Sequence, residues 1–328
     1  MNDRAAIIET VENGKLQKKF PQKVLIISDE HRGAKISDFP AYQAGILTLM
    51  ASGNYHHVVL LGDNAELFYI RNKHVKVYAG LLDVLAGKGT DHWKKEFDNK
   101  QKDPYHKIKN VIKGEMTFLQ EFLERYPHVT IHKVLGNHED VNSFRNKLDD
   151  LQRLYPHHFE WNAEAIRIGD ALFTHAHLPM SGKSDAQYEK SDLKDAKKFH
   201  KWTDFLHMIE RPGHQVVKYA RNHVTASDLM DQQLKKWDGK PDFHYLHEGK
   251  IMPFTIDWVK HVFFGHTHIK FDNHEKEGIL YHNSGAVTEI AVENDGLGIL
   301  EATLREDGTI TDVAPVQIFK DRHFHQAR

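Results

Sequence analysis

Short apolar runs alternate with amphipathic segments through the first half of the chain. Residues 23–28 (KVLIIS) and 57–62 (HVVLLG) are aliphatic runs that end in a polar turn, the pattern of strands buried on both faces. Between them, residues 42–50 place apolar side chains at helical spacing, and residues 119–126 do the same before the strand pattern of 129–136. The first half therefore predicts the order β-α-β-α-β, with right-handed crossovers.

The second half interrupts this pattern with a long polar segment. Residues 141–157 predict a helix, and residues 164–175 predict a hairpin. Residues 179–250 are rich in Lys, Asp and His and carry two amphipathic helical patterns, at 193–209 and 216–234. Strand patterns then return in three segments, at residues 257–265, 278–285 and 297–304. We expect one α/β domain over residues 1–328 with a helical insertion at about 179–250.

Composition excludes several classes of protein. The 328 residues include 44 Lys and Arg against 46 Asp and Glu, so there is no strong signal for nucleic-acid binding. The lack of cysteine excludes disulfide scaffolds, zinc ribbons, iron–sulfur sites and cysteine nucleophiles. The longest apolar runs, 24–27 and 58–61, are far below the roughly 18 residues of a membrane span, and residues 1–14 do not resemble a secretory signal. We therefore expect a cytoplasmic protein without a transmembrane segment.

Five polar segments follow predicted strands and contain metal-binding residue types. They are Asp29-Glu30-His31, Gly62-Asp63-Asn64, Gly136-Asn137-His138-Glu139, Thr174-His175-Ala176-His177 and Gly265-His266-Thr267-His268. The carboxyl ends of parallel strands border the crevice in which α/β proteins bind ligands, so these segments should converge. Carboxylate, imidazole and amide donors without thiolate suit Mn, Fe or Zn.

The spacing within these segments suits a pair of ions. Asp29 and His31 are two residues apart and would project to the same side of an extended chain. Asp63 has two carboxylate oxygens and could bridge two ions, while the preceding glycine lets the backbone come close. In the fourth segment either His175 or His177 could be the ligand. Each segment alone has an ordinary explanation as a turn or a hydrogen-bonded histidine, but five in a row at strand ends favour a metal centre.

The ordered set D-x-H, G-D-x-x-E (Gly62, Asp63, Glu66), G-N-H-E, H and G-H-T-H resembles the calcineurin-like metallophosphoesterase superfamily. The resemblance, which spans residues 29–268, implies a four-layer α-β-β-α sandwich of two mixed sheets flanked by helices, with two divalent ions. By its pattern the first ion would be held by Asp29, His31, Asp63 and His268. The second would be held by Asp63, Asn137, His175 and His266. His138 resembles the family's catalytic histidine, which is not a ligand.

The resemblance also implies an activity, the hydrolysis of a phosphomonoester or phosphodiester. The attack would be in line, by a hydroxide bridging the two ions, with His138 and Asp63 as catalytic residues and His138 as the general acid. Asn137 and His138 would contact the substrate, and Arg32 could bind a phosphate oxygen. Glu66 and Glu139 would lie behind the ligands, with Glu139 orienting a neighbouring histidine or simply solvated on a loop.

The substrate itself stays open between several classes. Asn64-Ala65-Glu66 is not the Trp- and Arg-containing form of the Ser/Thr protein phosphatases, which disfavours a phosphoprotein. Family members that cleave UDP-diacylglucosamine also carry a helical insertion where residues 179–250 stand, but they have Arg in place of His138. A nuclease is less favoured because acidic residues are interleaved with the lysines of 194–201. Two classes without hydrolytic activity also stay open, a non-catalytic binding module on the same fold and a His-rich metal store.

Overall fold

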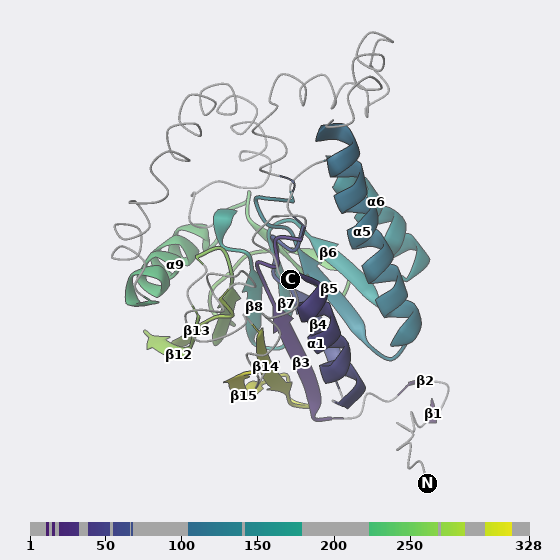
Figure 1. Cartoon of the computed structure of the whole chain (residues 1–328). Coiled ribbons are helices and arrows are strands. Elements are labelled where there is room, and N and C mark those ends of the chain that lie inside the picture. The colour runs from purple at the N-terminus through teal and green to yellow at the C-terminus, as the bar shows by residue number, and fades with distance from the viewer. Residues whose placement is uncertain are drawn as a thin grey trace.

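The computed structural model describes most of the predicted core. The described residues are 11–12, 15–16, 20–32, 39–52, 55–65, 67, 104–139, 142–178, 223–267, 270–285 and 299–316. They contain four helices, two mixed sheets and a short strand pair, β1 (Val11–Glu12) with β2 (Lys15–Leu16) (Figure 1). The helices are α1 (Phe39–Ser52), α5 (Pro104–Arg125), α6 (Asn142–Leu154) and α9 (His223–Trp237).

The first sheet has six strands, four of which are parallel. Its order is β15 (Ile310–Pro315), β14 (Ile299–Leu304), β3 (Gln22–Ile27), β4 (Tyr55–Leu60), β5 (Thr130–Val134) and β6 (Phe159–Asn162). Strands β3 to β6 run parallel, and β14 and β15 extend the sheet with antiparallel pairings. The predicted β-α-β-α-β order of the first half is confirmed for the strands and helices of this sheet.

The second sheet has seven strands. Its order is β10 (Lys250–Pro253), β9 (His244–His247), β7 (Ala165–Ile168), β8 (Ala171–Thr174), β11 (His261–Phe264), β13 (Ile279–Asn283) and β12 (Phe271–Lys276). The hairpin predicted over 164–175 is present as the antiparallel pair β7–β8, and β8, β11 and β13 run parallel. This sheet therefore combines local hairpins with a parallel centre.

The two sheets stack because each central strand is apolar on both faces. In β3, Leu25 and Ile27 pack with helices α1, α5 and α6, while Val24 and Ile26 pack against the second sheet. Phe173 of β8 enters the same layer between the sheets. Helix α9 covers the outer face of the second sheet, with Met230, Leu234 and Trp237 in a third apolar cluster. The result is a sandwich with the layers α, β, β and α, as predicted.

The structure does not assign residues 223–250 to the insertion that was predicted over 179–250. Residues 223–250 belong to the sandwich, because α9 contributes to its core and β9 pairs in parallel with β7. The prediction missed β9 and β10 because both strands are short and every residue of β10 is exposed. The remainder of the predicted insertion, 179–222, lies outside the described residues, and so does the helix expected at 193–209.

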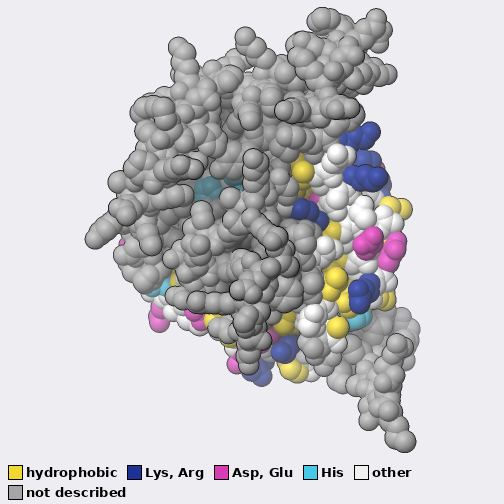
Figure 2. All heavy atoms as spheres, viewed as in Figure 1, with side chains coloured by type: hydrophobic (Ala, Val, Ile, Leu, Met, Phe, Trp, Pro, Cys, Tyr) yellow, Lys and Arg dark blue, Asp and Glu magenta, His cyan; other side chains and the backbone are white. Residues whose placement is uncertain are grey.

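The described surface is mixed in charge. On the face seen in Figure 1, basic and acidic side chains are interspersed among apolar ones wherever the residues are described (Figure 2). On α6, for example, Asp150 accepts a hydrogen bond from Lys147 at 3.0 Å. Among the described helices, none is long and apolar enough to cross a membrane.

Candidate metal centre

The turns that follow β3, β4, β5, β8 and β11 meet at one edge of the sandwich. The turn after β3 lies alongside the turn after β4, because the backbone N–H groups of Asp29 and His31 donate to the carbonyls of Gly62 (3.1 Å) and Asp63 (2.8 Å). Two further bonds join the sheets. His175 Nδ1 lies 2.7 Å from the carbonyl oxygen of Leu61, and the N–H of His266 donates to the Asp29 carboxylate at 3.0 Å. The convergence expected from the sequence is therefore present in the described turns.

Asp63 lies at the centre of this arrangement. Two groups of side chains offer ligand atoms within 4.8 Å of one another: His31, Asp63 and His138, and Asp63, His175 and His266. Asp63 Oδ2 lies 3.0 Å from His175 Nε2 and 3.8 Å from His138 Nε2. Both groups share the one buried carboxylate, which is the placement a bridging ligand requires.

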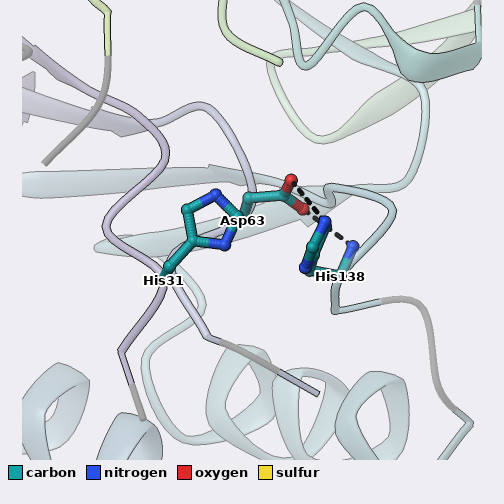
Figure 3. A group of neighbouring side chains, drawn as sticks. All are labelled: His31, Asp63 and His138. Atoms are coloured by element: carbon teal, nitrogen blue, oxygen red, sulfur yellow. Dashed lines mark hydrogen bonds and ion pairs between the residues drawn. The ribbon is translucent and has the colours of Figure 1, made fainter. Parts of the chain in front are cut away.

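The first group is drawn in Figure 3. His31 and His138 flank Asp63, and their rings make an edge contact with centroids 4.7 Å apart. The backbone N–H of His138 donates to Asp63 Oδ1 at 2.8 Å, so the residue that follows Asn137 also fixes the carboxylate. The resemblance assigned His138 no ligand role, yet one of its ring nitrogens lies within 4.8 Å of a possible ligand atom of His31 and of Asp63.

Asp29 and His268 are the other two ligands predicted for the first ion, and neither belongs to this group among the described residues. Asp29 is buried, with Oδ1 3.9 Å from His31 Nε2, and its carboxylate also accepts from the hydroxyl of Ser28 and from the N–H of His266. His268 and Glu66 lie outside the described residues. Among the described residues, Asp29 thus lies beside this group.

The second group contains the histidine favoured from the sequence. His175 is fully buried, with Nε2 3.3 Å from Asn137 Oδ1 and its ring centroid 5.2 Å from that of His266. His177 lies behind it, with ring centroids 5.3 Å from His175 and 6.5 Å from His266, and belongs to neither group. The geometry therefore favours His175 over His177, with Asn137 beside it.

Several of these residues adopt a backbone conformation that side chains usually avoid. Asp29, His31, Asp63 and His266 have φ values of 54°, 46°, 51° and 68°. Left-handed φ values are uncommon for residues other than glycine, and they concentrate at functional sites, where the neighbouring structure enforces them. Four of the predicted ligands share this strain, and the chain at Asp29 and His31 is therefore not extended, although their spacing had suggested an extended chain.

Glycines allow the turns to approach so closely. A Cβ on Gly62 would lie 2.6 Å from the backbone N of Gly136 and 2.8 Å from His175 Cγ. A Cβ on Gly136 would lie 2.7 Å from Asp63 Cγ, and one on Gly265 would overlap Ser28 and Asp29. The spacing role predicted for these glycines is confirmed, because a methyl group at each position would collide with a turn of the centre.

The electrostatics of the centre favour a charged carboxylate. Burial tends to raise the pKa of Asp63, but His138, His175 and His31 together hold that pKa well below its usual range. Burial tends to lower the pKa of His175, but the charge and hydrogen bond of Asp63 raise it. Burial lowers the pKa of His177 well below its usual range, and His175 and His266 lower it further. Asp63 is thus an anion surrounded by imidazoles, a donor set that a divalent cation fits.

Two predicted roles need correction. Arg32 was expected to reach a phosphate oxygen, but it is 8% exposed and its Nη1 lies 2.9 Å from Glu115 Oε2, with the guanidinium over the ring of Phe118. Glu139 was expected to orient a histidine or to lie solvated on a loop. It is fully buried and instead accepts from Lys133 Nζ at 2.7 Å. Both side chains lie on the helix side of the sheet, because Glu115 and Phe118 belong to α5 and Lys133 Nζ lies 5.9 Å from the ring of Phe144 in α6.

Sequence reasoning also missed residues that support the centre. Asn283, at the end of β13, donates through Nδ2 to the Gly265 carbonyl (3.1 Å) and to Thr267 Oγ1 (2.9 Å), which holds the turn that carries His266. Lys133 is a fully buried lysine inside β5, whose sequence is TIHKV. A lysine between strand-forming residues was the signal that the sequence offered for it.

Comparisons with known proteins add no function. No family model and no curated protein matches the sequence. Ten chains of solved structures match it; one, a crystal structure, aligns with 92% of this chain and 100% of its own, at 13% identity and a TM-score of 0.41. A likeness at that level carries no argument, so the function rests on the side chains of the centre.

Proposed function

We propose that the chain is a binuclear metal-dependent phosphoesterase that hydrolyses a phosphomonoester or phosphodiester. One observation carries the proposal: the buried carboxylate of Asp63 belongs to two separate His/Asp groups at once. A single carboxylate between two clusters of imidazoles is the ligand pattern of paired ions, whereas a single structural ion needs only one cluster.

The donor chemistry supports Mn, Fe or Zn as the ions. His31 and Asp63, with Asp29 beside them, would hold the first ion, and His175, His266 and Asn137 would complete the second with Asp63. These donors are imidazole nitrogen and carboxyl or amide oxygen, and the chain has no thiolate to offer. When bound, such a pair of ions activates water at neutral pH and neutralises the charge of the phosphate.

The chain's own residues would then position the substrate and move a proton. His138 is 15% exposed in its side chain, unlike the fully buried His175, so it can face both the centre and a substrate. Its Nε2 would donate a proton to the departing oxygen. General acid catalysis of this kind typically raises the reaction rate about 10²–10⁴-fold. The backbone N–H of His138 meanwhile keeps Asp63 oriented, which ties the acid to the ligand.

Metal-depleted protein reconstituted with Mn, Fe, Zn or Ca tests the proposal. We expect two ions to bind per chain and at least one transition metal to support hydrolysis within a panel of mono-, di- and pyrophosphate esters, UDP-diacylglucosamine included. Ca prefers a larger shell made only of oxygen and should be the poorest. Two bound ions without hydrolysis of any ester would favour a binding module, and failure to bind any metal would refute the centre itself.

A further inference from the structure

A second cluster lies directly behind the ligand-bearing turns, on the helix side of the six-stranded sheet. It consists of Glu30, Arg32, Asn64, Glu115, Lys133 and Glu139, each of which is 8% exposed or less. Burying charged groups is expensive, and apolar residues of similar volume often serve folding equally well or better. Five buried ionisable side chains beside a candidate active site therefore point to a purpose besides folding.

Lys133 is the centre of this cluster. From β5 its ammonium group donates to Asn64 Oδ1 at 2.5 Å, to Glu139 Oε1 at 2.7 Å and to Glu139 Oε2 at 2.8 Å. An ammonium has three protons, so these contacts use its full donor capacity. Lys133 thereby joins the turn after β4, which contains Asn64, to the turn after β5, which contains Glu139.

Asn64 and Glu139 extend the connection to further turns. Asn64 Nδ2 donates to Glu30 Oε2 at 2.6 Å, which reaches the turn after β3. Glu139 also accepts from the backbone N–H of Ala65 at 2.8 Å and of Gly136 at 3.2 Å. All three turns that supply Asp29, His31, Asp63 and His138 are therefore joined through side chains that point away from the centre.

The cluster is also anchored to helix α5. Arg32 Nη1 lies 2.9 Å from Glu115 Oε2, and its guanidinium lies 4.5 Å from the ring of Phe118. Both partners belong to α5, which packs on the same face of the sheet. The turn after β3 is thus fixed to a rigid element as well as to its neighbouring turns.

We infer that Lys133 and Asn64 are positioning residues. They set the separation of Asp63, His31 and His138 and hence the geometry of the two metal ions. This inference rests on the proposed metal centre. Glu30 lies between Asp29 and His31 in the sequence. Asn64 directly follows Asp63, and Glu139 directly follows His138. Because adjacent residues share a backbone turn, a shift of the buried side chain moves its neighbour in the centre. Metal ligands must hold their distances to about 0.2 Å, a tolerance that loops linked only by backbone rarely meet.

The variant Asn64→Leu tests the inference. Leucine has nearly the shape of asparagine but severs the link from Glu30 to Lys133, while the Lys133–Glu139 ion pair stays intact. The matched control is Tyr281→Phe, which removes one buried hydrogen bond, to Asp231 Oδ1 at 2.9 Å, from the α9 side of the molecule. Both proteins are measured for Mn²⁺ binding by calorimetry, for the exchange coupling of the bound Mn²⁺ pair by electron paramagnetic resonance, and for thermal unfolding without metal.

For Asn64→Leu we expect the Kd for Mn²⁺ to rise about 10–100-fold and the coupling signal of the Mn²⁺ pair to change, whereas Tyr281→Phe alters only the unfolding temperature. If Asn64→Leu does not fold, the double variant Lys133→Met with Glu139→Gln removes both charges of the ion pair and carries the same expectation. A variant with unchanged Mn²⁺ affinity and coupling would overturn the positioning role while leaving the metal centre in place. Absence of Mn²⁺ binding by the unaltered protein would overturn the proposed function and this inference together.

Discussion

Gly136→Ala should disable the metal centre through a single methyl group. The Cβ of an alanine at this position would lie 2.7 Å from Asp63 Cγ, and nearer still to Asp63 Oδ1 and to its backbone nitrogen. Ordinary contacts of a Cβ begin at 3.4 Å. Asp63 Cγ would therefore have to retreat by at least about 0.7 Å, and its Oδ1 by more, because packed interiors leave no spare volume.

That displacement cannot stay local. The backbone carbonyl of Asp63 accepts a hydrogen bond from the backbone N–H of His31 at 2.8 Å. The side-chain Oδ1 of Asp63 accepts one from the backbone N–H of His138, also at 2.8 Å. Moving Asp63 therefore moves both residues that flank it. A misplacement of about 1 Å can cost roughly 10²-fold in turnover, and disturbed ligands typically lose about 10–100-fold in metal affinity.

The matched control is the same substitution at Gly114 of α5, where nothing lies within 4 Å of the added Cβ. In this helix interior, Gly114→Ala should stabilise the fold by about 1 kcal/mol and leave the centre unchanged. Mn²⁺ titration calorimetry and chemical unfolding of both variants make the comparison. If Gly136→Ala bound Mn²⁺ as tightly as the unaltered protein and unfolded at the same denaturant concentration, the close approach of the two turns would not be what builds the site.

Three further perturbations address the proposed bridging ligand, the proposed acid and the core. Asp63→Asn should weaken binding of both ions, because an amide cannot replace a carboxylate shared by two charges; two ions retained at full turnover, by metal analysis, would contradict bridging. His138→Gln should keep both ions while kcat falls about 10²–10⁴-fold, and loss of metal would instead make His138 a ligand. Burial, followed by the charge of His261, lowers the pKa of His282 to about 3. Because the unfolded imidazole takes up a proton below about pH 6.5 and the folded one does not, His282 should reduce the free energy of unfolding of metal-free protein by about 2 kcal/mol between pH 7 and pH 5. Urea unfolding at both pH values checks this, and an equal pH dependence in His282→Gln would refute it.

The strands and the polar segments that follow them could be predicted because both signals are local. An aliphatic run such as 23–28 is specified by its own residues, and the polar turn that ends it marks the edge of a sheet. Since parallel strands of one sheet end at the same edge, the sequence could place Asp63 beside Asp29 and His138, which follow β4, β3 and β5. His175 follows a strand of the second sheet, and only the stacking of the two sheets brings it to Asp63. The pattern of apolar positions predicted only an α/β core, and the four-layer sandwich was expected from the family resemblance.

The direction of each side chain was decided only by the tertiary structure. Arg32 lies next to the proposed ligand His31 in sequence, but the partner that neutralises it, Glu115, comes from α5. Lys133 is charged, so its residue type suggests solvent, and only the folded turns supply the acceptors that allow its burial. Strands β9 and β10 were missed because each has only four residues and is stabilised by the neighbours that it pairs with and not by its own pattern. Hydrophobic periodicity thus determined where the chain is extended or helical, whereas ion pairs and edge strands depend on partners that come together only when the sheets and helices pack.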